Sequence, residues 1–244
     1  MQESNFNARV SSGAGEQRSN RRHTGNGPES QLRDRIRAEG VDVTRSRGDF
    51  LFRSGEPAPE IYLLVEGVVG VAHRCDSDIR HILGIMVPQS LIVPAVHYDE
   101  TARYSAECLS DSKFHALSRN AVKRIALTDP TILSAIQEEL GKAIDRAHSN
   151  LINLLSHHGA SRVATLLHQL DEEFKRAQVE QPGANHSDRW ADIAQVDLAA
   201  TLGMTPVYLN QILKKMKDEG VIELKSGKVK SVKASILKTI SESV

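Results

Sequence analysis

The chain has 244 residues, 40% of them apolar, and its 31 basic and 31 acidic residues give a formal net charge of zero at pH 7. This balance excludes a protein that packages nucleic acid through bulk positive charge, but it leaves room for a localised basic face. The two cysteines, Cys75 and Cys108, fit a reducing cytoplasm better than a disulfide-stapled secreted fold. No apolar run approaches the roughly 20 residues that span a bilayer, and the N-terminus lacks a hydrophobic signal core. We therefore expect a soluble cytoplasmic protein with no membrane partner.

Residues 1–29 differ in composition from the rest of the chain. They are rich in Ser, Gly, Asn and Arg, and Phe6 is their only aromatic residue. Such a segment cannot bury enough apolar surface to offset the entropy lost on ordering, so we expect a disordered tail. Contacts from its arginines to DNA phosphates are an alternative, but a solvated leader is the simpler interpretation.

Residues 30–130 form the next unit, in which short apolar runs alternate with turn signals. Between two of these runs, Glu66-Gly67 has the composition of a hairpin turn. Short strands at this spacing, with no long helix among them, predict a β-sandwich or a jelly-roll barrel. The expected strands cover residues 50–53, 61–65, 68–72, 80–86, 104–109 and 113–117.

Residues 131–158 carry apolar side chains at steps of three and four, which predicts one long amphipathic helix. Its apolar stripe has two uses: it covers the barrel, or it pairs with the same helix of a second chain. The stripe is narrow and contains the small residues Ala143 and Ala147, which permit close approach, so we favour a parallel pair and a homodimer. The stripe comprises Ile132, Ile136, Leu140, Ala143, Ile144, Ala147, Leu151, Leu154 and Leu155.

Residues 159–244 make up the C-terminal unit. A helix over 161–177 and a loop over 178–191 precede two short helices separated by Gly203, which has the backbone freedom that a tight turn needs. Two short strands then flank a Lys-Ser-Gly-Lys turn, as in a β-hairpin wing. We therefore expect a winged helix-turn-helix, and an α+β fold for the whole chain: a jelly-roll barrel, a long dimerisation helix and a winged helix-turn-helix.

The second short helix of this unit is amphipathic. Thr205 suits its N-cap and Pro206 its first turn. Its apolar side chains recur with the helical period, and lysines on and after the helix supply charge that DNA phosphates require. A solvated face on a small α+β bundle is the alternative, but helix spacing, turn, cap and wing together favour DNA binding. The expected buried residues are Leu209, Ile212, Leu213 and Met216, and the lysines are Lys214, Lys215, Lys217, Lys225, Lys228, Lys230 and Lys233.

From about residue 47 to 235 the chain resembles the CRP/FNR superfamily of bacterial transcription regulators. The resemblance rests on GDFLFRSGEPAPEIYLLVEGVVGV, on the long helix, and on DLAATLGMTPVYLNQILKKMKDEGVIEL; the segment 87–104 matches poorly. It implies an effector barrel, a dimerising helix and a winged helix that binds a palindromic operator in double-stranded DNA. The resemblance is also compatible with RNA polymerase as a second partner.

Within the second helix, the resemblance assigns Thr205 and Lys214 to DNA phosphates. Pro206, Val207 and Gln211 stand where the best-known members read bases with arginine, glutamate and arginine. We therefore expect the same docking on a different operator, with less guanine readout, because Gln211 can bond to adenine and Val207 can contact a thymine methyl. The further DNA-binding candidates are Tyr208, Asn210 and Lys215.

Members of the family that bind cyclic AMP hold its phosphate with a Gly-Glu helix start and an Arg-Ser pair. Here Val93-Pro94 and Tyr104-Ser105 stand at those places, and Arg103 lies one position off. Proline also removes a backbone donor. Arg103, Tyr104 and Ser105 are therefore the effector-binding candidates, in a barrel expected to have lost or changed cyclic-nucleotide binding.

Other cofactors and activities find less support. The iron–sulfur branch of the family needs four cysteine ligands, and this chain has two. His73, Cys75, His81 and His97 are candidate haem ligands without a recognised spacing, so the cofactor stays unknown. No P-loop, H-E-x-x-H or G-x-S-x-G motif occurs, so we predict no enzyme, no catalytic residue and no metal site. The main rival to a DNA-binding regulator is an effector-binding barrel protein whose winged helix is vestigial.

Overall fold

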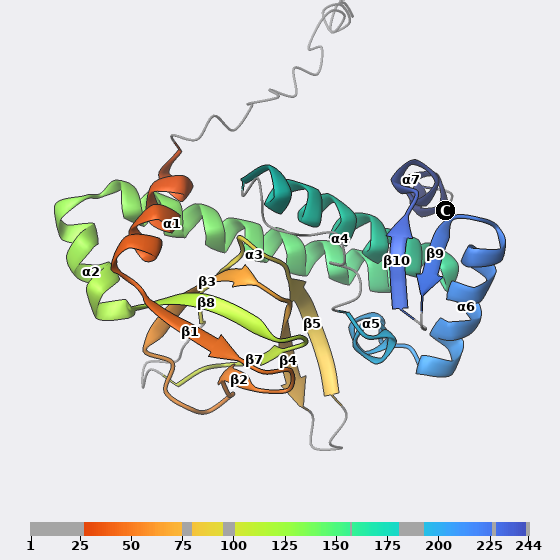
Figure 1. Ribbon diagram of the computed structural model, residues 1–244, viewed down its shortest axis with the longest axis horizontal. Helices are drawn as coiled ribbons and strands as arrows, with labels where there is room; N and C mark the ends of the chain where they lie inside the picture. Colours follow the sequence, from red (N-terminus) through yellow and green to blue (C-terminus); the bar gives the residue numbers. More distant parts are fainter. Residues whose placement is uncertain are drawn as a thin grey trace, which may run out of the picture.

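The computed structural model describes residues 27–74, 80–94, 101–156, 158–180, 193–225 and 228–242. Most of the expected tail and the haem-ligand candidates Cys75 and His97 lie outside these residues. Figure 1 shows the strands of the N-terminal half beneath two long helices, with the helices and strands of the C-terminal unit at one end. Within the described ranges, no helix is long and apolar enough to cross a membrane.

Eight strands form two antiparallel four-stranded sheets, ordered β1-β8-β3-β6 and β2-β7-β4-β5. An apolar core draws on both sheets, and within it the Phe52 and Tyr62 rings stack with centroids 6.4 Å apart. The six expected strands are present, whereas β1 and β6 were not predicted because β1 is mostly exposed and β6 has two residues. The strands are β1 (Val41–Arg45), β2 (Phe50–Phe52), β3 (Glu60–Glu66), β4 (Val69–Arg74), β5 (Arg80–Met86), β6 (Leu91–Ile92), β7 (Ser105–Cys108) and β8 (Ser112–Ser118).

The turn from β3 to β4 depends on Gly67, as its sequence position predicted. Its φ of 92° lies in the left-handed region. A Cβ at this position would overlap the backbone of Asp111 and Ser112. Only glycine therefore allows the two chain segments to approach this closely.

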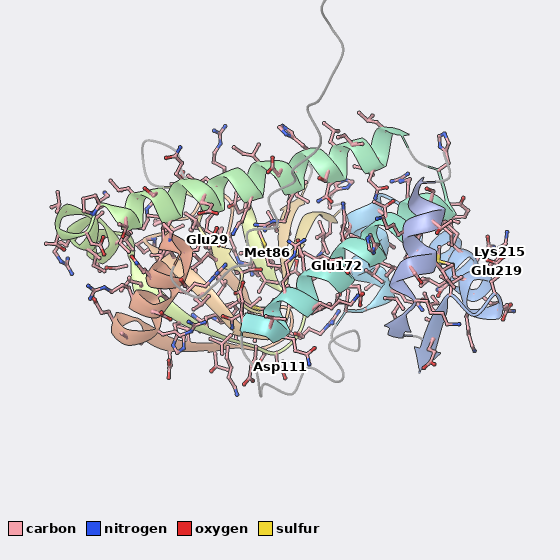
Figure 2. The ribbon with its side chains drawn as sticks, turned by 90° about the horizontal axis from the view of Figure 1, so that it is seen from above. Glu29, Met86, Asp111, Glu172, Lys215 and Glu219 are labelled. Carbon is pink, nitrogen blue, oxygen red and sulfur yellow. The ribbon has the colours of Figure 1, made fainter. Side chains whose placement is uncertain are left out.

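A short helix that the sequence did not predict, α1 (Pro28–Glu39), precedes the sheets. The helix begins inside the expected tail, so the tail prediction was wrong for its last two residues. The signal was weak because only Leu32 and Ile36 supply fully buried apolar side chains. Ion pairs connect α1 to the long helix. A guanidinium nitrogen of Arg33 lies 3.2 Å from a carboxylate oxygen of Glu139. The Lys142 ammonium donates a hydrogen bond to the carboxylate of Glu29, which is labelled in Figure 2.

The helix α2 (Arg119–Thr128) leads into the long α3 (Thr131–Ser156), which confirms the predicted long helix. One face of α3 packs on α1 and the sheets, where Ile132 and Ala135 are fully buried. The adjoining face carries Leu140 and Ile144, about half exposed. The stripe predicted as one narrow band is thus two faces, one of which covers the sheet domain.

The helix α4 (Ala160–Glu180) follows a short turn at Gly159 and diverges from α3 (Figure 2). At the junction, the Asn153 side chain donates a 3.1 Å hydrogen bond to the carbonyl of Arg162. The Arg162 guanidinium in turn donates to the carbonyl of Leu202 in the C-terminal unit. Side-chain hydrogen bonds therefore link the end of α3 to α4, and α4 to the helix-turn-helix.

The C-terminal unit has the expected helix, turn, helix and hairpin. Its apolar core is continuous with α4 and with side chains of the sheet domain, among them Val68 and Ile82. The last helix was not predicted, although its nine residues are amphipathic. The elements are α5 (Gln195–Leu202), α6 (Pro206–Asp218), β9 (Ile222–Lys225), β10 (Lys228–Val232) and α7 (Ala234–Glu242).

Candidate DNA-binding surface and effector site

The turn between α5 and α6 has the geometry that its sequence predicts. Gly203 ends α5 in the left-handed conformation, with φ 58° and ψ 38°. Thr205 caps α6, since its hydroxyl oxygen accepts a 3.2 Å hydrogen bond from the backbone N–H of Tyr208. Pro206 occupies the first turn, where its missing N–H leaves no bond unmade.

The helix α6 separates an apolar inner face from a polar outer face. Leu209, Ile212, Leu213 and Met216 are buried, as expected from the helical period. The candidate DNA-binding residues all lie on the exposed surface of this helix and its cap, and Val207 reaches 69% exposure. They are Thr205, Pro206, Val207, Tyr208, Asn210, Gln211, Lys214 and Lys215.

Besides the cap residue Thr205, Lys215 and Tyr208 also make contacts within the chain. Lys215 pairs loosely with Glu219 at 3.9 Å, and both side chains, labelled in Figure 2, are exposed. The Tyr208 ring reaches back to the junction of α3 and α4, where a Cβ on Gly159 would lie 2.8 Å from the phenol oxygen. Tyr208 is therefore both half exposed and packed against the junction.

The sheet domain meets the helix-turn-helix through an ion cluster that the sequence did not reveal. Asp197, in the first turn of α5, accepts 2.8 Å hydrogen bonds from Arg47 and from Arg80. Arg80 also donates a 2.8 Å bond to Glu107 of β7. These partners are 150 and 117 residues from Asp197 in the chain, so no local pattern could have indicated them.

The three effector candidates are adjacent in the chain, and their side chains have different surroundings. Tyr104 packs against Phe52, with ring centroids 5.8 Å apart, and its hydroxyl donates a 3.0 Å bond to the carbonyl of Val93. The Ser105 hydroxyl accepts a 3.0 Å bond from the N–H of Ser54. Arg103 is exposed. Two of the three are thus engaged in contacts within the sheet domain.

A cavity of about 640 Å³ lies between β5, α3 and α4. Met86 lines it from the sheet and Glu172 from α4, and both are labelled in Figure 2. Its wall includes Glu173, whose pKa is raised by burial against the opposing effect of Arg146 and Arg176. The volume is in the range of small-molecule sites.

Two of the four haem-ligand candidates lie in the described residues, and the structure brings them together. His73 and His81 are cross-strand partners on β4 and β5. Cys108 is buried, and burial raises the pKa of its thiol to about 11, which opposes a reactive thiolate. In the part of the chain that the structure describes, no three His, Cys, Asp or Glu side chains are grouped to hold a metal ion.

Two family models match the chain. The cyclic nucleotide-binding domain matches residues 43–129, and the Crp-like helix-turn-helix domain matches residues 161–239. Together they cover more than half of the sequence, one on each side of α3. The chain therefore carries both halves of this regulator architecture.

Individual relatives agree with the family models. The CRP-like cAMP-activated global transcriptional regulator of Mycobacterium tuberculosis is 24% identical over 184 residues, which are 75% of this chain and 80% of that protein. The nitrogen fixation regulation protein FixK of Azorhizobium caulinodans is 23% identical over 194 residues, 79% of this chain and 75% of that one. The solved structure of FixK2 from Bradyrhizobium japonicum is similar in fold, with a TM-score of 0.72 at 16% identity over 84% of this chain and 98% of that chain.

The sequence motifs, the fold and these relatives lead to one assignment. The relatives are transcription regulators and not enzymes, in line with the sequence prediction. The chain belongs to the CRP/FNR superfamily of transcription regulators.

Proposed function

We propose that this regulator binds a palindromic operator as a homodimer and reads it with α6. The observation that carries the proposal is the outer surface of α6, where all eight candidate residues are exposed while the four apolar ones hold the helix in place. A helix mounted in this way can enter a major groove without rearrangement.

The exposed face of α3 supports the dimer. Leu133, Leu140, Ala147 and Leu154 recur every seven residues, and Ile144 and Leu151 follow the second and third of them by four. These are the a and d positions of a two-stranded coiled coil. The five large side chains are between 42% and 57% exposed, and no described part of the chain covers them. A second copy of α3 is the partner that has the matching period.

In the DNA complex, three residues of α6 would contact bases. Gln211 can donate to and accept from adenine, and Val207 can contact a thymine methyl. Asn210 has the same amide chemistry as Gln211. Thr205, Lys214 and Lys215 would contact phosphates, while Pro206 and Tyr208 shape the end of the helix. Two such helices related by a two-fold axis would occupy grooves about 34 Å apart.

Selection from random DNA by the purified full chain tests this assignment. We expect a palindrome with fewer guanine contacts than the standard half-site of the cyclic-AMP receptor protein; recovery of that standard half-site would refute the proposed reading. Gln211→Ala should weaken binding to the selected site by roughly 5- to 150-fold and relax preference at one base pair. Lys214→Ala should instead weaken all sequences alike and reduce the salt slope by about one.

The sheet domain has, in this proposal, lost the family's mode of cyclic-nucleotide binding. Tyr104 occupies the place of the phosphate-binding arginine, and its hydroxyl is bonded to Val93, which itself replaces a residue of the Gly-Glu pair. Calorimetric titration with cyclic AMP and cyclic GMP should show no binding at micromolar concentrations. The cavity between β5, α3 and α4 is a candidate location for a changed effector.

The rival function, an effector-binding protein with a vestigial winged helix, is disfavoured by the intact cap, turn and exposed face of α6. The two functions differ in their response to salt. A DNA-reading dimer loses affinity for its operator steeply as salt rises, because phosphate contacts release counterions. RNA polymerase as a partner stays a prediction from the family resemblance.

A further inference from the structure

We propose that Asp197 is a positioning residue that fixes the angle of the reading helix on the sheet domain and thereby sets the operator spacing. It acts within the Asp197 cluster, which comprises Asp197, Arg47, Arg80 and Glu107. This inference rests on the proposed homodimer, because a spacing exists only between two reading helices.

The Asp197 carboxylate is held from two sides. Its side chain is 2% exposed, and each of its oxygens accepts a 2.8 Å bond from a different arginine. Both arginines come from the sheet domain, one from the turn after β1 and the other from the start of β5. A buried carboxylate with both oxygens bonded in this way has little rotational freedom.

Both arginines also make hydrogen bonds to other groups of the sheet domain. Arg80 donates to Glu107 of β7 at 2.8 Å, and its pKa is raised because these two carboxylates outweigh the effect of burial. Arg47 donates to the carbonyl of Leu109, and its backbone N–H donates a 2.9 Å bond to Asp111. The sheet domain therefore restrains both arginines, and through them the Asp197 carboxylate.

Apolar packing and the ion cluster have different roles in this attachment. Val68 and Leu109 of the sheet domain share one hydrophobic core with Leu198 and Leu202 of α5. Apolar contacts hold surfaces together without strict direction, whereas hydrogen bonds to a carboxylate fix orientation. The core thus attaches α5, and the Asp197 cluster sets its rotation.

The attachment leaves the reading surface free. The sheet domain contacts α5, and α5 lies between β5 and α6 in Figure 1. The candidate residues of α6, from Thr205 to Lys215, stay exposed in this arrangement. An autoinhibitory contact would cover them, so the arrangement is one that can bind DNA.

A fixed reading helix has a measurable consequence on DNA. Adding one base pair between two half-sites moves them apart by about 3.4 Å and rotates one relative to the other by about 34°. A dimer whose reading helices are rigidly mounted loses contacts at such an operator. A dimer with loosely mounted helices adapts and discriminates less.

The test compares operators whose spacer is shortened by one base pair, unchanged or lengthened by one, built from the palindrome that the wild-type chain selects. Binding is measured by fluorescence anisotropy. We expect the wild type to prefer its own spacer by at least about tenfold, and Asp197→Asn to reduce this preference to less than about threefold. Affinity for a single half-site should stay within about twofold, because no residue of the reading surface has changed.

Two further variants complete the design. Arg47→Gln removes a partner of Asp197 whose side chain is 46% exposed, so this variant should keep the fold and still reduce the spacer preference. Arg47→Lys should restore part of the spacer preference. Glu66→Gln is the matched control: it breaks the exposed 2.8 Å pair with Lys113 in the same domain and should leave spacer preference unchanged. Thermal unfolding and mass measurement verify fold and dimer for each variant.

The outcomes separate the inference from the function on which it rests. If the wild type binds two half-sites no more tightly than one, the proposed dimeric reading fails. If the wild type discriminates and folded Asp197→Asn and Arg47→Gln discriminate equally well, the positioning role alone fails. Tighter binding of Asp197→Asn to all three operators would also overturn it, because that is the behaviour of an autoinhibitory contact.

Discussion

The dimer seam proposed on α3 gives a prediction whose size follows from the exposed area of its side chains. Leu140 and Ile144 are 47% and 55% exposed, so about half of each side chain remains to be buried by a second helix. Covering a whole Leu or Ile stabilises by about 1.5–3 kcal/mol, and half of one therefore contributes about 0.7–1.5 kcal/mol. Two positions on two helices make four side chains. The double variant Leu140→Ala, Ile144→Ala should lose about 3–6 kcal/mol of association free energy, a weakening of the dimer by roughly 10²- to 10⁴-fold.

Sedimentation equilibrium of the full chain over a range of concentrations measures this change. The matched control is Leu127→Ala, at the end of α2, because that leucine is 85% exposed and lies off the seam. Loss of exposed apolar surface alone would affect both variants, whereas loss of a coiled-coil contact affects only the double variant. A dissociation constant that shifts by less than tenfold, or that shifts equally in the control, refutes the seam.

Three other predictions follow from single side chains. Thr205→Ala should destabilise the fold by about 1 kcal/mol in urea unfolding, while Thr205→Ser should not, because serine keeps the oxygen that caps α6; equal stability of the two variants would contradict the cap. Burial raises the pKa of Glu173, so the folded protein holds its proton more tightly than the unfolded chain and loses stability as pH rises above the ordinary value of 4.5. Glu173→Gln should therefore raise the melting temperature at pH 7 but not near pH 4.5, and a gain independent of pH would exclude this cause. In a Cys75→Ser background, Cys108 should react with Ellman's reagent at pH 8 only as fast as the protein unfolds, because its thiol is buried and has a pKa of about 11; rapid labelling of the native protein would argue against burial.

The sequence predicted elements whose signals are local. The cap at Thr205, the turn at Gly203 and the apolar spacing of α6 all lie within a few residues of one another, and together they predicted the helix-turn-helix. The hairpin at Gly67 is local in the same sense. Such features depend on backbone conformations that neighbouring residues set, so a single sequence is enough to identify them.

Features that depend on distant parts of the chain could not be predicted. The faces of α3 look alike in sequence, because both carry Ile and Ala, and only the fold decides which of them meets the sheets. The short helix α1 depends on distant partners, because Leu32 and Ile36 pack in a core shared with α3 and ion pairs join the two helices. Asp197 reads as an ordinary acid in the first turn of a helix, and its partners become visible only when β5 and α5 are placed side by side.

The contact between Tyr208 and Gly159 couples α6 to the junction between the two long helices. Val207, Asn210 and Gln211 are exposed, so new side chains there should cost the fold little, and under the proposed function they would alter the DNA sequence that is recognised. Tyr208 fills the space that Gly159 leaves empty, and Gly159 has a φ of 48° that side chains other than glycine's adopt with strain. In the proposed function, operator preference can therefore change at three positions of α6 independently of the fold, whereas a larger residue at position 159 would require a smaller one at position 208.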